Sequence, residues 1–223
     1  MKTKHKNPAT SILCFVMAIC AATAFTGCGN TNNGADSEQT ADGASASDEA
    51  VQAGEVYQFE AEYVDLTDKA GAGPSNAAME TELVLADANA SNGYYIGYTY
   101  FADLYFDFNI TADADGEANL EIVMASDLGA VSIGPSVFEI SVNDTIISYD
   151  EFKLSDSSGK INKVFGTYTI SKVNLVAGEN KITLKILSNE LYNGGTGGPL
   201  IDCIILETPA VLSWSPVTSN VNK

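Results

Sequence analysis

The 223-residue chain contains no arginine and only one histidine, His5, which lies among the N-terminal lysines. We expect this histidine to be removed with a signal segment. The remaining chain would then lack the side chains for Ser-His-Asp or Cys-His catalysis and for a histidine-ligated zinc site. The sequence also has no phosphate-binding loop and no dinucleotide-binding glycine fingerprint. These absences argue against the commonest hydrolase and nucleotide-binding classes.

The N-terminal segment has the three parts of a secretory signal. Lysines at positions 2, 4 and 6 precede an apolar stretch over residues 12–25, and Thr26, Gly27 and Cys28 follow it. A cysteine after small residues resembles a bacterial lipobox, with Phe25 where Leu is commoner. The alternative, a transmembrane anchor, would need a longer apolar stretch. We therefore expect cleavage before Cys28 and a lipid on Cys28 that anchors the protein in the membrane at the bacterial cell surface.

Positive charge and cysteine are both scarce after the signal. Removing it leaves eight lysines against 29 Asp and Glu residues, a formal charge of −21. This balance excludes the electrostatic footprint of a nucleic-acid binder and disfavours direct contact with anionic lipid. Cys203 would be the only cysteine besides Cys28. No internal disulfide can then form, and we expect Cys203 to be a core thiol because its neighbours are apolar.

Composition divides the chain into four segments. Residues 1–27 form the signal peptide. Residues 28–54 are rich in Gly, Ala, Ser, Asn, Asp and Glu, which predicts a flexible acidic linker without a core. Residues 55–209 have the length of one globular domain. Residues 210–223 contain Trp214 and are expected to be an extra strand or a tail.

Period-2 alternation of apolar and polar residues dominates the globular part, and no stretch has a convincing helical period. Strands are predicted at 55–64, 81–86, 93–98, 103–112, 118–126, 136–143, 145–149, 164–176, 180–188 and 199–207. The clearest apolar faces are Leu104, Phe106, Phe108 and Ile110, then Leu120, Ile122 and Met124, then Phe138, Ile140 and Val142, and then Ile182, Leu184 and Ile186. Many short alternating strands predict an all-β fold, a β-sandwich or jelly roll.

Two strands carry carboxylates that need a partner. Glu60 and Glu62 would lie on one face of the first strand, about 7 Å apart. Asp202 stands alone in an apolar run over 199–206, where an isolated carboxylate is costly. We hypothesise that these strands lie side by side and that the three carboxylates bind one structural Ca²⁺, which prefers oxygen ligands. The alternative is that all three are solvated charges.

Five stretches together resemble carbohydrate-binding modules of families 6 and 35. They are 59–62 (FEAE), 91–97 (SNGYYIG), 138–143 (FEISVN), 173–182 (VNLVAGENKI) and 198–202 (GPLID). Each is weak alone, but their order and spacing fit over about 150 residues. The resemblance implies a galactose-binding-like jelly roll, a structural calcium near the first and last strands, and sugar binding by loops at one edge.

The resemblance also implies which residues bind the sugar. Such modules use aromatic rings, which stack on the C–H faces of a sugar, and an Asn. The matching positions are Tyr94 or Tyr95, Phe165 and Tyr168, together with Asn189, Tyr192 and Asn193 in a Gly-rich loop. Two departures are the absence of tryptophan at 165–168 and Leu200 at a position that is often Asn. For every one of these aromatic residues, core packing is the alternative role.

The resulting hypothesis is a non-catalytic, lipid-anchored carbohydrate-binding module for a neutral poly- or oligosaccharide, with glycoside hydrolases or transporters as partner proteins. The alternative is a structural or protein-interaction lipoprotein on the same fold that does not bind sugar, which Leu200 favours. A third is a lipid-anchored glycoside hydrolase, since a carboxylate pair cannot be recognised from sequence spacing.

Overall fold

The computed structural model describes residues 54–67, 69, 83–99, 101–127, 129–188 and 198–221. All of them belong to one structural unit, Glu49–Lys223. The predicted signal peptide, the lipidation of Cys28, most of the predicted linker, and Asn189, Tyr192 and Asn193 lie outside the described residues. Within the described part, no helix is long and apolar enough to cross a membrane.

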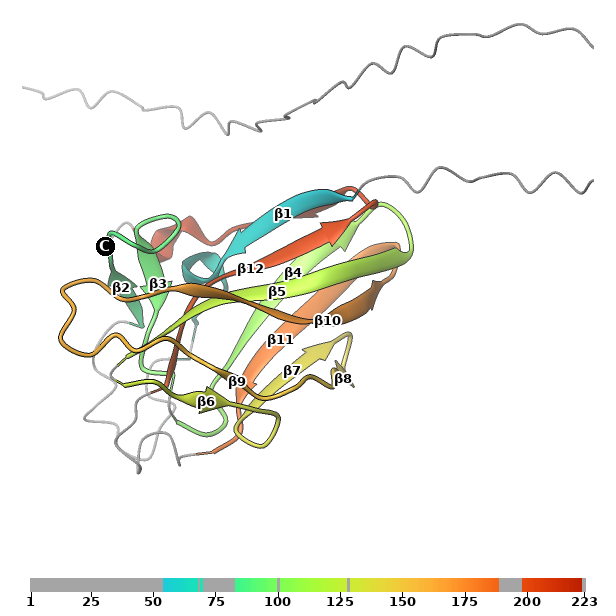
Figure 1. Ribbon diagram of the computed structural model, residues 1–223. Coiled ribbons are helices and arrows are strands. Elements are labelled where there is room, and N and C mark those ends of the chain that lie inside the picture. Colours follow the sequence, from blue (N-terminus) through green and yellow to red (C-terminus); the bar gives the residue numbers. More distant parts are fainter. Residues whose placement is uncertain are drawn as a thin grey trace, which may run out of the picture. The chain divides into compact units, whose positions relative to one another are not determined.

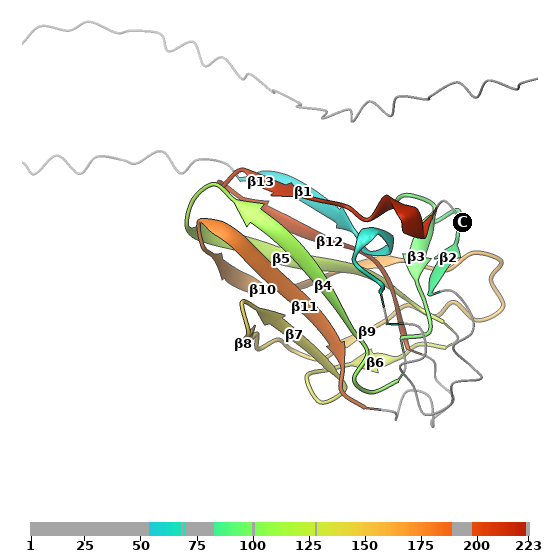
Figure 2. The same cartoon turned by 180° about the vertical axis from the view of Figure 1, so that it is seen from behind.

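Antiparallel strands form two main sheets that lie against each other (Figures 1 and 2). The β12 sheet has the order β10 (Gly166–Leu175), β5 (Gly116–Ser126), β12 (Pro199–Thr208), β3 (Tyr94–Ile96) and β2 (Val84–Ala86), with β1 (Glu55–Glu60) also paired to β12. The β11 sheet has the order β13 (Leu212–Trp214), β4 (Tyr105–Ala112), β11 (Gly178–Ile186), β7 (Phe138–Val142) and β8 (Thr145–Ile146). A small pair joins β6 (Ser132–Ile133) to β9 (Phe152–Lys153), and η1 (Ala61–Tyr63) and η3 (Thr218–Asn220) are single 3₁₀ turns. The predicted all-β sandwich of jelly-roll type is confirmed.

The core lies between the inner faces of the two sheets. The apolar faces predicted from the alternation are buried, including Phe106 and Phe108 of β4, Ile122 of β5 and Leu184 of β11, all with no measurable exposure. Each such side chain stabilises the fold by about 1.5–3 kcal/mol through removal from water. Cys203, the only cysteine among the described residues, is a free buried thiol, so this burial and not a disulfide stabilises the described part of the domain.

The structure differs from the predicted strands at the start of the domain and decides between the two alternatives for its end. The first strand was predicted to run over 55–64 but ends at Glu60, because Ala61–Tyr63 turn as η1. Glu60 and Glu62 therefore do not share one strand face. At the other end, β13 is a strand, and its Trp214 stacks on Phe59 with 5.5 Å between ring centroids. The strands β6 and β9 have two residues each, too few for alternation to reveal.

The pairing of β1 with β12 fixes the position of Asp202. The two strands are antiparallel, with Glu60 opposite Cys203, so the predicted neighbourhood of these strands is confirmed. On the other side of β12, the register with β5 shifts between Ile201 and Cys203. Asp202 is the extra residue in this bulge, and bulges re-aim side chains relative to the regular alternation. This is how a carboxylate within an apolar run reaches its polar partners.

Candidate functional site

Three carboxylates from separate segments converge on the turn that precedes β3. Ser91 Oγ lies 2.5 Å from Glu60 Oε2 and 3.0 Å from Asp202 Oδ1. The backbone N–H of Ser91 also donates to both Asp202 oxygens, at 3.1 Å each. Gln58 donates to the remaining oxygen of Glu60 at 2.8 Å. Glu60 and Asp202, which are 142 residues apart in the sequence, thus share one hydroxyl partner.

Glu62 is the third carboxylate and the most deeply buried. Its side chain has no exposure, and Asn92 Nδ2 donates to its Oε1 at 3.0 Å. Its other oxygen, Oε2, is buried without a hydrogen-bond partner, and it is the only such side-chain atom in the described part of the chain. Leaving a buried carboxylate oxygen unpaired costs more than a typical hydrogen bond contributes. This atom therefore indicates a missing partner.

Burial controls the protonation of this cluster. Desolvation raises the pKa of Glu62 to about 7, against the hydrogen bond from Asn92, and the charges of Glu60 and Asp202 add to the rise. Desolvation likewise raises the pKa of Asp202 to about 6, against the hydrogen bonds from Ser91. None of the ion pairs found among the described residues reaches these carboxylates. Within the described part of the chain, no lysine compensates the charge of this cluster.

The donor set fits a hard cation such as Ca²⁺. It offers carboxylate, hydroxyl and amide oxygens, one of which is buried without a partner. As placed in the described part of the chain, however, no three His, Cys, Asp or Glu side chains form a ready group of metal ligands. Glu60, Glu62 and Asp202 are instead linked through Ser91 and Asn92. The sequence predicted that the three carboxylates gather, but it did not identify these two linking residues, although both lie in the 91–97 stretch.

A short turn carries Ser91 and Asn92 to the carboxylates. Asp87 starts it by accepting the N–H of Asn89 at 2.8 Å, and the Asp87 N–H donates to the carbonyl of Gly93 at 3.0 Å. Gly93 has a φ of +81°, a conformation that residues with a Cβ rarely adopt. The Asn-Gly pair in the sequence is therefore required to close the turn and to start β3.

Tyr94, Tyr95 and Phe165, three of the predicted sugar-binding aromatic residues, lie close to this turn, but not all of them are accessible. Tyr95 is only 5% exposed and belongs, with Leu200, to a small apolar cluster separate from the core between the sheets. Phe165 is partly exposed and packs edge-on against Tyr95, at 5.6 Å between ring centroids. The Leu200 side chain is 3% exposed and packs in the same apolar cluster as these two rings. Tyr95 is thus a packing residue here, and it leaves Phe165 as the ring on the surface of this cluster.

Lys163 fixes the segment that carries Phe165. Its Nζ is 2.8 Å from Asp127 Oδ1, and its backbone N–H donates to Asp87 at 2.8 Å. Its carbonyl accepts a hydrogen bond from Asn89 at 2.9 Å. These bonds tie the segment before β10 to the turn that carries Ser91. Phe165 and the carboxylate cluster are therefore positioned by the same turn.

The remaining predicted sugar residues are divided. Tyr94 is partly exposed at the start of β3. Tyr168 stacks on Phe152 with 4.8 Å between ring centroids and packs against the core, so its ring is occupied by packing. Asn189 and Asn193 lie outside the described residues. Tyr94 and Phe165 are partly exposed, and so is Tyr168, although its ring stacks on Phe152.

The five stretches that carried the resemblance meet at two places. The stretches 59–62, 91–97 and 198–202 supply the carboxylate cluster and its partners. Gly198 lies so close to Thr99 that a Cβ would be 2.6 Å from the Thr99 carbonyl oxygen, which explains the glycine. The stretches 138–143 and 173–182 meet where Asn143 donates to Asn180 at 2.9 Å.

Known structures with a similar fold include several carbohydrate-binding modules. The Podospora anserina GH26-CBM35 β-(1,4)-mannanase has 16% identity over 69% of this chain and 27% of its own, with a TM-score of 0.46. The CBM35 from Cellvibrio japonicus Abf62 has 12% identity over 72% of this chain and 98% of its own, with a TM-score of 0.46. A family 35 module from Clostridium thermocellum has 21% identity over 68% of this chain and 98% of its own, with a TM-score of 0.43.

No protein-family model matches the sequence, and no curated protein matches it at a significant level. The chain spans about a quarter of the length of the mannanase. At identities below 25%, these similarities concern the fold alone.

Proposed function

We propose that this protein is a non-catalytic carbohydrate-binding domain, held at the bacterial cell surface by a lipid on Cys28 and containing one structural Ca²⁺. The observation that carries the proposal is the convergence of Glu60, Glu62 and Asp202 on Ser91 and Asn92. It brings together three of the stretches on which the sequence resemblance depends. A bound cation would also neutralise three neighbouring carboxylates that form no ion pair with a lysine among the described residues.

The proposed role of the calcium is structural. Glu60, Glu62 and Asp202 would hold the ion, and the ion would neutralise charge that the protein itself leaves unpaired. Because Ser91 and Asn92 contact the same carboxylates, the ion would also fix the turn before β3. That turn contacts Lys163, and Lys163 is two residues from Phe165. Calcium would thus stabilise the loop edge without contacting the sugar.

Sugar binding is assigned to the edge that carries Tyr94 and Phe165. The partly exposed Phe165 ring can pack against the C–H face of a pyranose, and Asn89 is a polar side chain that contacts the same segment through the Lys163 carbonyl. A neutral saccharide suits this edge, because the strong negative charge of the chain would repel an anionic one. A lipid on Cys28 and the linker 28–54 would then present the domain to extracellular polysaccharide.

A protein-interaction or structural role on the same fold is the second candidate. Burial of Tyr95 and Leu200 in one apolar cluster favours it, since this edge then has fewer polar groups for hydroxyls. In that case a protein partner would cover Phe165, and no saccharide would bind there.

The test is a glycan array followed by calorimetry on the full chain with Ca²⁺. We expect Phe165→Ala and Tyr94→Ala to weaken binding of the best glycan, whereas Tyr94→Phe, which keeps the ring, should retain it. Binding that is unchanged in both alanine variants would place the sugar elsewhere. An array without any hit, together with a protein partner whose capture depends on Phe165, would support the second candidate instead.

A further inference from the structure

The outer face of the β11 sheet has a small polar hollow of about 460 Å³. This volume lies in the range of ligand-binding pockets. Its floor is a row of side chains across three strands. In the strand register, Thr183 of β11 lies opposite Asp107 of β4 on one side and opposite Ser141 of β7 on the other. Directly opposite residues have Cβ atoms about 4.5–5.5 Å apart, so one small group can reach all three.

Ser141 contributes a polar group without a partner to this floor. The residue is only 8% exposed, and it lines the hollow. Its neighbours Ile140 and Val142 belong to the core, so the alternation of β7 directs Ser141 to the outer face. Its hydroxyl makes no hydrogen bond within the part of the chain that the structure describes. Because buried hydroxyls nearly always have a partner, this one indicates that a ligand in the hollow supplies it.

Thr183 and Asp107 complete a set of hydrogen-bond acceptors. The Thr183 hydroxyl donates its hydrogen to Asp107 Oδ1 at 2.7 Å. Thr183 Oγ1 can therefore only accept from a ligand, whereas Asp107 adds a carboxylate. With Ser141 Oγ, oxygens from three strands can accept hydrogen bonds from one group. An ammonium group has three donors and no acceptor, which matches this set.

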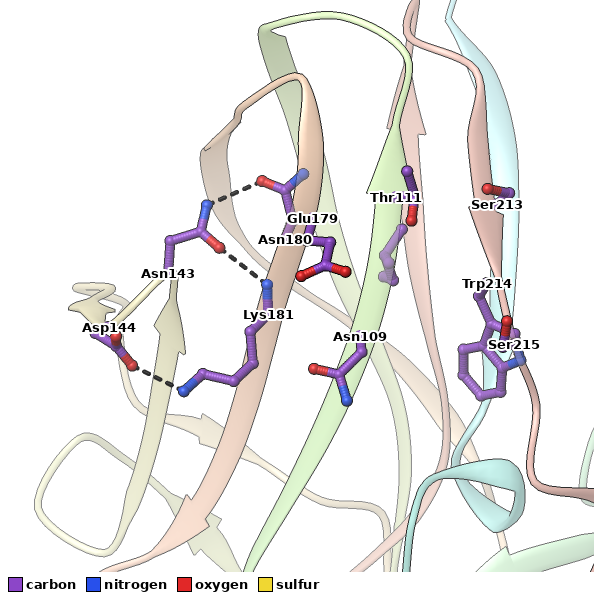
Figure 3. A pocket seen from close by; sticks show the side chains of 11 residues that line it. Asn109, Thr111, Asn143, Asp144, Glu179, Asn180, Lys181, Ser213, Trp214 and Ser215 are labelled. Carbon is purple, nitrogen blue, oxygen red and sulfur yellow. Dashed lines mark hydrogen bonds and ion pairs between the residues drawn. The ribbon is translucent and has the colours of Figure 1, made fainter.

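The charges around the hollow also favour a cation. Asp144 lies 2.9 Å from Lys181 Nζ, so these two charges cancel; both residues line this hollow and the larger one beside it (Figure 3). Asp107 and Glu139, which also line the hollow, form no ion pair among the described residues. The lining therefore keeps an excess of negative charge, and the formal charge of −18 of the whole chain attracts cations as well.

Two nearby lysines do not form ion pairs with these carboxylates. Lys185 lies opposite Glu139 in the register, but its Nζ is 3.6 Å from Asp103. Lys69 Nζ lies over the ring of Tyr105, 3.0 Å from its centroid, and Tyr105 lines the hollow. The chain thus already binds one of its own alkylammonium groups at the rim of the hollow, through a cation–π contact.

The rim offers apolar surface for a carbon chain. Ile146 of β8 is 67% exposed, and it lines the hollow on the side of the floor away from Tyr105. The alkyl stem of an amine packs on such surface while its charged end stays with polar partners. A ligand with an ammonium end and an aliphatic stem therefore fits both parts of the hollow.

We propose that this hollow, with Asp107, Ser141 and Thr183 at its floor, binds the ammonium group of an aliphatic amine. Two sources present this group, a free polyamine and the lysine side chain of a peptide, and the experiment distinguishes them. The site does not depend on carbohydrate binding, because none of the residues that form it belongs to the edge at Tyr94 and Phe165.

Calorimetric titration of the full chain at about 0.15 M NaCl, which screens diffuse charge attraction, tests the site. The probes are cadaverine, its neutral analogue pentane-1,5-diol, and a capped lysine, Nα-acetyl-lysine methylamide. We expect both amines to bind saturably and the diol not to bind, because only the amines carry an ammonium group. Tighter binding of the capped lysine than of cadaverine identifies a peptide as the source of the amine. The reverse order identifies a free polyamine.

Three variants locate the binding. Asp107→Asn keeps an acceptor for Thr183 but removes the charge, so it should weaken amine binding about tenfold. Ser141→Ala should weaken it about fivefold, without lowering the melting temperature, because the hydroxyl has no partner to lose. The matched control Glu179→Gln removes a carboxylate from the same face of β11, outside this hollow, and should leave amine binding unchanged.

Three outcomes would overturn the proposal. Binding of the diol as tight as that of cadaverine would show that the ligand is not recognised by its ammonium group. An equal loss of amine binding in Glu179→Gln and Asp107→Asn would show attraction by the overall charge without a built site. Absence of heat for both amines, together with a melting temperature that neither amine changes, would reject the site. Each of these outcomes leaves the carbohydrate-binding function untouched, because that function is tested with neutral glycans and Phe165→Ala.

Discussion

Ser91 Oγ lies within hydrogen-bond distance of both Glu60, at 2.5 Å, and Asp202, at 3.0 Å. A hydroxyl group has a single hydrogen to donate, so it can satisfy only one of these two acceptors at a time. The second carboxylate then keeps only its other donor, which is the Ser91 N–H at Asp202 or Gln58 at Glu60. Glu62 Oε2 has no donor at all and is buried. The cluster therefore stores unfavourable electrostatic energy that a bound cation or protonation would relieve.

Calcium is expected to raise the melting temperature of the protein. At a concentration one hundred times Kd, a ligand of the folded state stabilises it by about 2.7 kcal/mol. For a domain of this size this corresponds to about 5–10 °C. The measurement is thermal unfolding by circular dichroism in CaCl₂ and in EGTA.

Glu62→Gln is the sharpest variant for this prediction. It removes a buried charge but keeps the shape of the side chain, so the variant should be at least as stable as the parent in EGTA and should gain nothing from calcium. Glu179→Gln, at an exposed position, should keep the full calcium response. Identical melting curves of the parent protein in CaCl₂ and EGTA would eliminate the calcium site.

Without calcium, stability is expected to fall as the pH rises. Burial raises the pKa of Glu62 from an ordinary 4.5 to about 7, and that of Asp202 from 3.8 to about 6. Between the unfolded and folded values, the folded state binds more protons than the unfolded state. The contribution of these two groups to stability is therefore greatest below about pH 4 and is lost through about pH 7.

The corresponding measurement is urea unfolding in EGTA between pH 4 and pH 8. Glu62→Gln should flatten the upper part of this profile, because its amide does not titrate. Calcium should flatten it too, since a cation takes the place of the proton. A parent profile that rises steadily over this range in EGTA would contradict the pKa shifts and their assignment to burial.

The sandwich could be predicted because it depends on period-2 alternation, which β4 and β11 display without interruption. The meeting of Glu60 with Asp202 could be predicted from the cost of burying carboxylates. The turn at η1 could not be predicted from the sequence, since Ala61 and Tyr63 fit the apolar–polar alternation of a strand. The packing roles of Tyr95 and Tyr168 could not be predicted either. A tyrosine that packs against other rings has the same sequence pattern as one that binds a sugar.

Asn180 is expected to be essential for the stability of the β11 sheet. It is 2% exposed, its Nδ2 donates to the carbonyls of Val176 and Gly178, and its Oδ1 accepts from Val176 and Asn143. Asn180→Ala should lower the free energy of unfolding by about 2–4 kcal/mol, since several backbone groups lose their partner. Urea unfolding measures this change.

Asn180→Asp separates the effect of losing the side-chain hydrogen bonds from the effect of changing the side-chain size. An aspartate has nearly the same shape but cannot donate to the carbonyls of Val176 and Gly178, so it should destabilise the protein to a similar extent. Asn174→Ala, at an exposed position of β10, should change the free energy of unfolding by less than about 0.5 kcal/mol. An aspartate variant as stable as the parent would show that the side-chain donor is not needed.

The C-terminal segment is expected to support the carboxylate cluster through Asn220. Its Nδ2 donates to the carbonyls of Glu62 at 2.8 Å and Val64 at 2.9 Å, which holds η1 in place. Asn220→Ala should cost about 1–2 kcal/mol of stability and weaken the calcium response. The matched control is the exposed neighbour Ser219→Ala. A normal calcium response in Asn220→Ala would mean that η1 holds Glu62 without help from this segment.

Leu200 decides whether the loop edge resembles a polar sugar site or an apolar cluster. The sequence resemblance to carbohydrate-binding modules implies Asn at this position, yet here the Leu200 side chain is 3% exposed and belongs to the cluster of Tyr95 and Ala125. Leu200→Asn should therefore destabilise the protein by about 2–4 kcal/mol and should not strengthen sugar binding, because the amide would be buried among apolar groups. Leu200→Met keeps the apolar volume and should cost less than about 1.5 kcal/mol. Urea unfolding and calorimetry on both variants measure the two effects. A stable asparagine variant that binds saccharide more tightly than the parent would show that residue 200 faces the ligand and not the cluster.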